Sequence, residues 1–309
     1  MKAQLREVYA KTMSKSPKIL NNFRGQPFAL LAVGLLSLLL AILCFIPHPL
    51  ALLAGYGHFF LLGVIGAVVA NVTGAGGGVV FIPAFTSLGV AGIQALGTSL
   101  AIQSFGMTAG SISWLMAAHR HQHGGKDTVA LTYHLLIIAG TAAVAGMLSA
   151  QYLLPPPGWP VATLFKYFSV LFGAILLLVT IRKNRHRHTL YRVRRRHVPL
   201  IILVCYSGGL ITSWISVGAG EWLAILLFFL GYPTLVIITA AVVISSMTVL
   251  SGLPYHLLIA DSISWKILLF AAPAAILGGF IARLLAERLG PVRLKIFFAA
   301  WILATGLAM

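Results

Sequence analysis

Seven apolar runs of about 20 residues divide this chain, and short polar segments separate them. They cover residues 28–46, 96–118, 131–153, 163–181, 236–258, 265–285 and 291–308. About 20 consecutive apolar residues let a helix cross the hydrocarbon layer of a bilayer. Only 9% of the 309 residues are charged, whereas about 25% is usual for a soluble domain. The sequence therefore predicts an all-α polytopic membrane protein.

Two further apolar blocks, residues 57–91 and 198–233, are interrupted by glycine clusters. Four glycines lie among residues 74–78, and Gly218 and Gly220 lie in the second block. Glycine inside a helix costs about 1 kcal/mol, and irregular backbone at membrane depth must be buried in protein or line a cavity. We expect each block to be a broken or re-entrant helical hairpin, with new half-helices beginning near Gly78 and Glu221.

The formal charge of +17 is concentrated in short segments, which argues against a nucleic-acid partner. Cytoplasmic loops of membrane proteins retain Lys and Arg. If each broken block makes an even number of crossings, the basic segments 1–27, 182–197 and 283–295 all lie on one face. This predicts a cytoplasmic N-terminus and a periplasmic C-terminus. We read residues 28–50 as an uncleaved, extra N-terminal transmembrane helix after the basic tail.

The two broken blocks resemble each other, as residues 72–89 and 216–231 show. Gly110 precedes Gly252 by 142 residues, close to the offset between the glycine clusters. Each block and the three spans after it form one unit, 51–181 and 198–309, joined by the basic cytoplasmic linker 182–197. The units start on opposite sides of the membrane, so we expect inverted-topology repeats. Chance similarity between glycine-rich apolar segments is the alternative.

Two half-helix N-termini brought together at the midplane form a site for an anion. A helix N-terminus has free N–H donors and about half a positive charge, and glycine lets the backbone approach a ligand. Asn71, Thr73 and Ser216 add donors. The alternative is that the glycines only allow close helix crossing.

Glu221 is the one acidic residue of the five that falls deep within a predicted membrane segment. A bound anion repels its ionised form, which makes Glu221 the candidate for proton coupling. The alternative is a first-turn carboxylate stabilised by the helix dipole. Thr98, Ser99 and Gln103 either line the pathway or bond neighbouring helices. Trp222 packs against either the substrate or the membrane core.

The run "TGAGGGVVFIP" (73–83), together with "ALGTSL" (95–100), resembles the first-half signature of the TauE/SafE family of sulfite and organosulfonate exporters. The similarity covers roughly residues 57–308. It implies a bacterial inner-membrane transporter for sulfite, sulfonates such as sulfoacetate, or related oxyanions, with binding at Gly74 to Gly78, Thr98 and Ser99. The second half departs from the family pattern, because Glu221-Trp222 stands where further glycine is expected and "TAA" (239–241) replaces Gly-Thr-Ser.

We therefore expect a secondary transporter that exports a small sulfur-containing anion. The predicted substrate-binding set is Asn71, Thr73, Gly74, Ala75, Gly76, Gly77, Gly78, Thr98, Ser99, Gln103, Ser216, Gly218, Ala219, Gly220, Glu221 and Trp222. Import of a related oxyanion, and a non-transporting membrane scaffold or lipid-binding protein, are the alternatives. We expect no catalysis, cofactor, metal site or nucleic-acid partner. The expected partners are the anion and membrane lipid, with a homodimer left open.

Overall fold

The structure is a computed structural model that describes part of the chain. The described residues are 26–74, 76–120, 126–182, 190–289, 296, 299–300, 303–304 and 306–307. Within these ranges the regular structure is helical, without strands, which agrees with the predicted all-α class. The chain divides into two compact units at Ala51–Leu52, which are described separately below.

The first unit contains α3 (Gln26–Phe45), a 20-residue helix rich in leucine and alanine. It coincides closely with the apolar run at 28–46 and ends shortly before Pro47. A second, short helix, α4 (Pro49–Tyr56), begins in this unit and ends in the next. No predicted span includes α4. It forms a bent pair with the helix that follows, at 45°.

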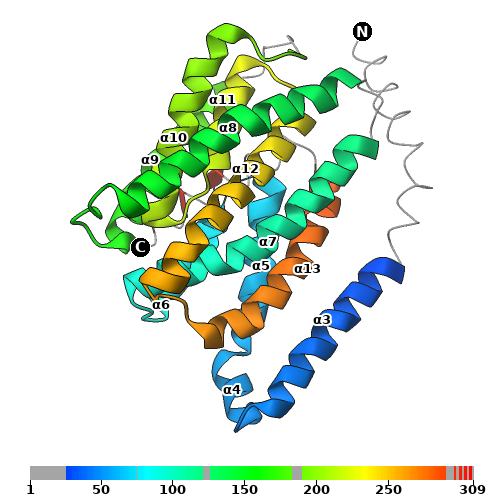
Figure 1. Ribbon diagram of the computed structural model, residues 1–309, viewed down its shortest axis with the longest axis vertical. Coiled ribbons are helices and arrows are strands. Elements are labelled where there is room, and N and C mark those ends of the chain that lie inside the picture. The colour runs from blue at the N-terminus through cyan, green and yellow to red at the C-terminus, as the bar shows by residue number, and fades with distance from the viewer. Residues whose placement is uncertain are drawn as a thin grey trace. The chain divides into compact units, whose positions relative to one another are not determined.

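The second unit holds both broken blocks and the helices that follow them (Figure 1). The first half comprises α5 (His58–Thr73), α6 (Gly78–Ser87), α7 (Gly92–Arg120), α8 (Lys126–Tyr152) and α9 (Val161–Arg182). The second half comprises η2 (Arg195–His197), α10 (Val198–Ile215), α11 (Ala219–Leu230), α12 (Thr234–Pro254), the π-helical turn η3 (Tyr255–Ile259) and α13 (Trp265–Leu289). Both helix breaks lie where the glycine clusters predict them.

Helices of the two halves pack on one another rather than only on their own neighbours. The most extensive contacts are those of α5 with α13 and of α8 with α10, and α7 lies against α12 at the centre. The short helix α6 contacts α5 and α7, and α11 contacts α10 and α12. Figure 1 shows α6 toward one end of this bundle and α11 toward the other. The two breaks are thereby enclosed by α5, α7, α10 and α12.

Four helices in the described part of the chain are long and apolar enough to cross a membrane. They are residues Asp127–Tyr152, Arg195–Ile215, Thr234–Ile259 and Trp265–Ala286, and α4 with α5 makes a fifth if a bent pair is one span. With 29 residues, α7 is longer than any of them but less apolar. Several of its polar side chains are buried, among them Thr98, Ser99, Gln103 and Ser104. A helix of this kind is suited to line a polar centre inside an apolar bundle.

Two predicted segments fall wholly or largely outside the described residues. They are the basic tail at 1–27 and the last predicted span at 291–308. Contacts at two glycines nevertheless place part of the last predicted span next to α9. A Cβ atom added at Gly173 of α9 would lie 2.9 Å from the backbone nitrogen of Leu303, and one at Gly306 would lie 2.9 Å from Ser169. Leu303 and Gly306 therefore pack closely on α9.

Candidate functional site

Both helix breaks are built on residues with left-handed backbone. Gly74 ends α5 with φ 79°, and its N–H donates to the carbonyl of Ala70 at 3.0 Å. Ser216 ends α10 with φ 61°, and its N–H donates to the carbonyl of Thr212 at 2.8 Å. Left-handed backbone is the usual end of a helix and is easiest for glycine. Each preceding helix thus ends inside the bundle, and the next begins a few residues later.

The backbones of the two breaks touch. A Cβ atom built on Gly76 would lie 2.8 Å from the Cα atom of Gly218, and one on Gly218 would lie 2.7 Å from the nitrogen of Gly76. A Cβ atom on Gly78 would collide with the carbonyl of Ser216. Any larger residue at these positions would separate the breaks. We call this meeting point, residues 74, 76–78 and 216–220, the crossing.

Gln103 of α7 holds the crossing together. Its Oε1 accepts the N–H of Gly77 at 2.7 Å, next to the start of α6. Its Nε2 donates to the hydroxyl of Ser99 at 3.1 Å and to that of Ser216 at 2.7 Å. The Ser99 and Ser216 hydroxyls are also 2.9 Å apart. The Gln103 amide therefore bonds the N-terminus of α6 and the C-terminus of α10, the helix that precedes α11.

The second half-helix has a matching arrangement. The N–H of Gly220, in the first turn of α11, donates to the hydroxyl of Ser245 on α12 at 3.0 Å. Ser245 follows Gln103 by 142 residues, the same offset that relates Gly110 to Gly252. In each half, a polar side chain from the following long helix accepts a first-turn N–H. These acceptors occupy the donors that an anion would use.

Glu221 lies in the first turn of α11 and is 2% exposed. The Gly76 amide is close enough to act on the carboxylate, but neither carboxylate oxygen has a partner with hydrogen-bond geometry. The acidic residue of the second half therefore lies beside the glycine break of the first. An ionised carboxylate buried without a hydrogen-bond partner is costly. An ionisable residue inside a membrane segment is therefore a candidate functional residue.

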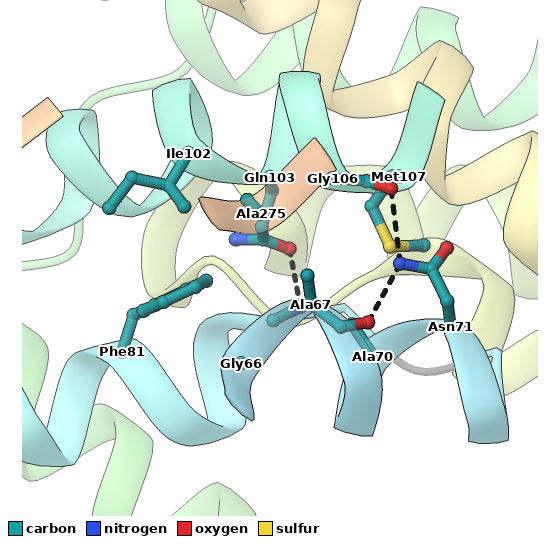
Figure 2. Close-up of a pocket in the computed structure, with 11 residues that line it drawn as sticks. Gly66, Ala67, Ala70, Asn71, Phe81, Ile102, Gln103, Gly106, Met107 and Ala275 are labelled. Atoms are coloured by element: carbon teal, nitrogen blue, oxygen red, sulfur yellow. Dashed lines mark hydrogen bonds between the residues drawn. The ribbon is translucent and has the colours of Figure 1, made fainter. Parts of the chain in front are cut away.

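A small pocket borders the crossing (Figure 2). Its gaps between atoms are too narrow for a water molecule, and Asn71, Gly77 and Gln103 are among its lining. Figure 2 shows Asn71 on α5 and Gln103 on α7, with the Asn71 amide between two carbonyls. That amide donates to Ala67 at 2.8 Å and to Gly106 at 3.1 Å. The structure thus shows the crossing closed.

The predicted site residues separate into a group at the crossing and a group that bonds elsewhere. The first contains Gly74, Gly76, Gly77, Gly78, Ser99, Gln103, Ser216, Gly218, Ala219, Gly220 and Glu221, while Asn71 lines the adjoining pocket. Ala75 lies outside the described residues.

The remaining predicted residues bond elsewhere. The Thr73 hydroxyl donates to the carbonyl of Val69 on its own helix at 2.9 Å. The Thr98 hydroxyl accepts the N–H of Ser264 at 2.9 Å. The Trp222 ring packs on α9, with ring centroids 5.3 Å from Phe168 and 4.9 Å from Phe172. Trp222 therefore contributes to packing between helices in this structure.

Two residues that bond the crossing were not predicted. One is Ser245, which the 142-residue offset from Gln103 would have indicated. The other is Thr212, whose hydroxyl donates to the Gly208 carbonyl of its own helix and to the Val217 carbonyl beyond the break, both at 2.7 Å. No pattern in the sequence distinguishes Thr212 from other threonines in apolar helices.

Comparison with known proteins gives a family match. The family model for the sulfite exporter TauE/SafE matches residues 59–309, which include both breaks and every helix from α5 onward. The match begins after α3 and α4, as the sequence resemblance implies. Among curated proteins and among solved structures, no match was found.

Proposed function

Because the chain belongs to the sulfite exporter TauE/SafE family, we propose that it is a secondary transporter that exports a small sulfur-containing anion across the bacterial inner membrane. The substrate is sulfite or an organosulfonate such as sulfoacetate. Both present several oxygen atoms that accept hydrogen bonds, and both carry negative charge. The membrane location agrees with the apolar helices, and the class of substrate agrees with the family.

The observation that carries this proposal is the contact between the two half-helix N-termini. Gly77, just before α6, and Gly220, in the first turn of α11, point N–H groups at neutral side-chain oxygens, those of Gln103 and Ser245. Replacing a neutral acceptor by an anion strengthens a hydrogen bond to a backbone N–H. An oxyanion that displaces these two side chains gains both helix ends at once. No lysine or arginine is required.

We further propose that residues 51–181 and 198–309 are inverted repeats, with α3 as an extra membrane helix. The packing partners of corresponding helices support this. In the proposed repeat, α10 corresponds to α5, and α13 corresponds to α8. The helix α5 packs on α13, and α10 packs on α8. The central pair, α7 and α12, are counterparts of each other. A twofold axis in the membrane plane relates such elements in transporters with inverted repeats.

Glu221 couples transport to protons in this proposal. Its buried carboxylate lies beside the Gly76 amide, so a bound anion and an ionised Glu221 would repel each other. Anion binding then requires a protonated carboxylate, and anion affinity falls as pH rises. Glu221→Gln should remove that dependence, because glutamine keeps the shape of the side chain and does not titrate. Binding of sulfoacetate across a pH series checks this, and an unchanged pH profile in the variant would leave Glu221 as a structural residue.

Reconstitution of the purified chain into liposomes tests the proposed function. Vesicles loaded with labelled sulfite or sulfoacetate should lose the label faster than protein-free vesicles, and unlabelled substrate should compete. Sulfate, thiosulfate and acetate, used in parallel, measure selectivity. Uptake without efflux would favour an importer. Absence of flux with every anion would favour a membrane scaffold and overturn the proposal.

A further inference from the structure

A second buried polar cluster lies at the end of the bundle that holds the α12–α13 connection. His256 is 2% exposed and belongs to the π-helical turn η3, which continues α12 beyond Pro254. Such π-turns inside helices are frequent at functional sites. The proposed topology places this α12–α13 connection at the outer face of the membrane and the basic linker 182–197 at the inner face.

Only one of the two ring nitrogens of His256 has a hydrogen-bond partner. Its Nδ1 is 2.8 Å from the hydroxyl of Ser262, whereas its Nε2 is buried without any hydrogen-bond partner. Tyr255 contacts the ring edge-on, with centroids 5.3 Å apart. Asp261 of the same connection is exposed, and Lys266 lies over the ring of Tyr56 at 5.7 Å. When the Ser262 hydroxyl donates to Nδ1, the proton of the neutral ring is on Nε2, which is then a free donor.

This cluster adjoins the crossing along α7. Ser262 packs on Gly97, where an added Cβ atom would meet the hydroxyl and carbonyl oxygens of Ser262. The next residue, Thr98, accepts the N–H of Ser264, and the residue after it, Ser99, bonds Ser216 at the crossing. Gly97, Thr98 and Ser99 of α7 therefore contact, in turn, Ser262 beside His256, the α12–α13 connection and the crossing.

We propose that His256 and Ser262 form an outer binding station for the oxyanion that leaves the crossing, a role that rests on the proposed function above. The Nε2–H of His256 donates to an oxygen of the anion, and the Ser262 hydroxyl holds the ring in the tautomer that carries this proton. The Thr98 hydroxyl lies between the station and the crossing. A buried donor without a partner is costly, and an anion arriving from the crossing satisfies it.

Kinetics measured from each side of the membrane test the station. Right-side-out and inside-out membrane vesicles present labelled sulfoacetate to the outer and the inner face. His256→Phe keeps a planar ring and removes the donor, so the apparent KM at the outer face should rise about tenfold, the loss of one charge-assisted hydrogen bond. The KM at the inner face should not change. His256→Gln, which keeps an N–H donor, should restore most of the outer affinity.

His134→Phe is the matched control, because His134 is exposed and bonds only a carbonyl of its own helix, at 2.7 Å. Ser262→Ala provides a second variant that leaves the imidazole in place, and it too should weaken binding at the outer face. An unchanged outer KM in His256→Phe, or an equal rise at both faces, would overturn the station. If the wild-type protein exchanged no sulfoacetate from either face, the proposed function itself would fail.

Discussion

Gln103 bonds three segments of the bundle through one side chain. It accepts the N–H of Gly77, donates to both oxygen atoms of Ser216 and donates to Ser99 one turn back on α7. Sequence spacing predicts that Ser99 and Gln103 share a helix face, because they are four residues apart, and their hydrogen bond confirms it. Their partners on α6 and α10 were not predictable, since those contacts depend on how distant helices pack.

Gln103→Leu should therefore destabilise the fold and abolish anion binding. An anion displaces only the Gln103 Oε1 from the Gly77 N–H, whereas leucine also removes the Nε2 bond that holds Ser216 at the crossing. It leaves the Gly77 N–H and the Ser216 hydroxyl without this partner, and each such buried group costs about 1–3 kcal/mol. The thermal unfolding midpoint in detergent should fall, and sulfite binding should be lost.

Gln151→Leu is the control, because Gln151 makes a single bond, to the Gly252 carbonyl at 3.0 Å, away from the crossing. It should keep anion binding. Sulfite binding that survives in Gln103→Leu would remove this residue from the site.

The half-helices α6 and α11 are the elements that the sequence predicts most directly. Glycine clusters within apolar blocks indicate a break, and α6 begins at Gly78 as expected, while α11 begins at Ala219, two residues before Glu221. The helix α4 was missed, because eight apolar residues after a proline give no periodic signal. The π-helical turn after Pro254 was also missed, since it arises from tertiary packing around His256.

The packing of α5 on α13 depends on glycine, and one substitution tests this. A Cβ atom at Gly278 would lie 2.6 Å from the carbonyl of Val64 and 2.9 Å from Ala67. Gly278→Ala should therefore destabilise the protein by about 1–3 kcal/mol, through overpacking. Gly55→Ala, where an added Cβ atom meets nothing within 4 Å, should be neutral or slightly stabilising. Equal unfolding midpoints for the two variants would contradict the close packing of α5 on α13.

At the scale of the whole molecule, long helices from residues 51–181 pack on long helices from residues 198–309. Weak sequence similarity between residues 72–89 and 216–231 was sufficient to propose two halves, because glycine positions recur at a nearly constant offset. It was not sufficient to predict which helices pack together. The asymmetry between the halves is also visible in the sequence, where Gly76 and Gly77 of one break have Gly220 and Glu221 as counterparts.

The proposed orientation predicts which loops face outward. Gly158, in the uncharged loop between α8 and α9, should be outside, and Arg192, in the basic linker, should be inside. Single cysteines at these positions, in a chain with Cys44 and Cys205 replaced by alanine, are labelled with a membrane-impermeant maleimide. Gly158→Cys should react in intact cells, and Arg192→Cys only after the membrane is permeabilised. The reverse result would invert the topology and the direction assigned to the outer station.

Calorimetric binding of sulfite to the purified wild-type protein and to Gly76→Ala tests whether an anion binds where the two half-helices meet. The added methyl group would be forced against Gly218 and Gln103 and would separate the two breaks. Gly92→Ala, whose Cβ atom would make an ordinary contact at 3.6 Å with Val161, is the control.

The wild-type protein and Gly92→Ala should bind sulfite and sulfoacetate more tightly than acetate. Gly76→Ala, and Gly218→Ala from the other half, should lose more than about tenfold in affinity while still unfolding cooperatively. Folded variants at both glycines that bind sulfite as tightly as the wild-type protein would place the anion elsewhere.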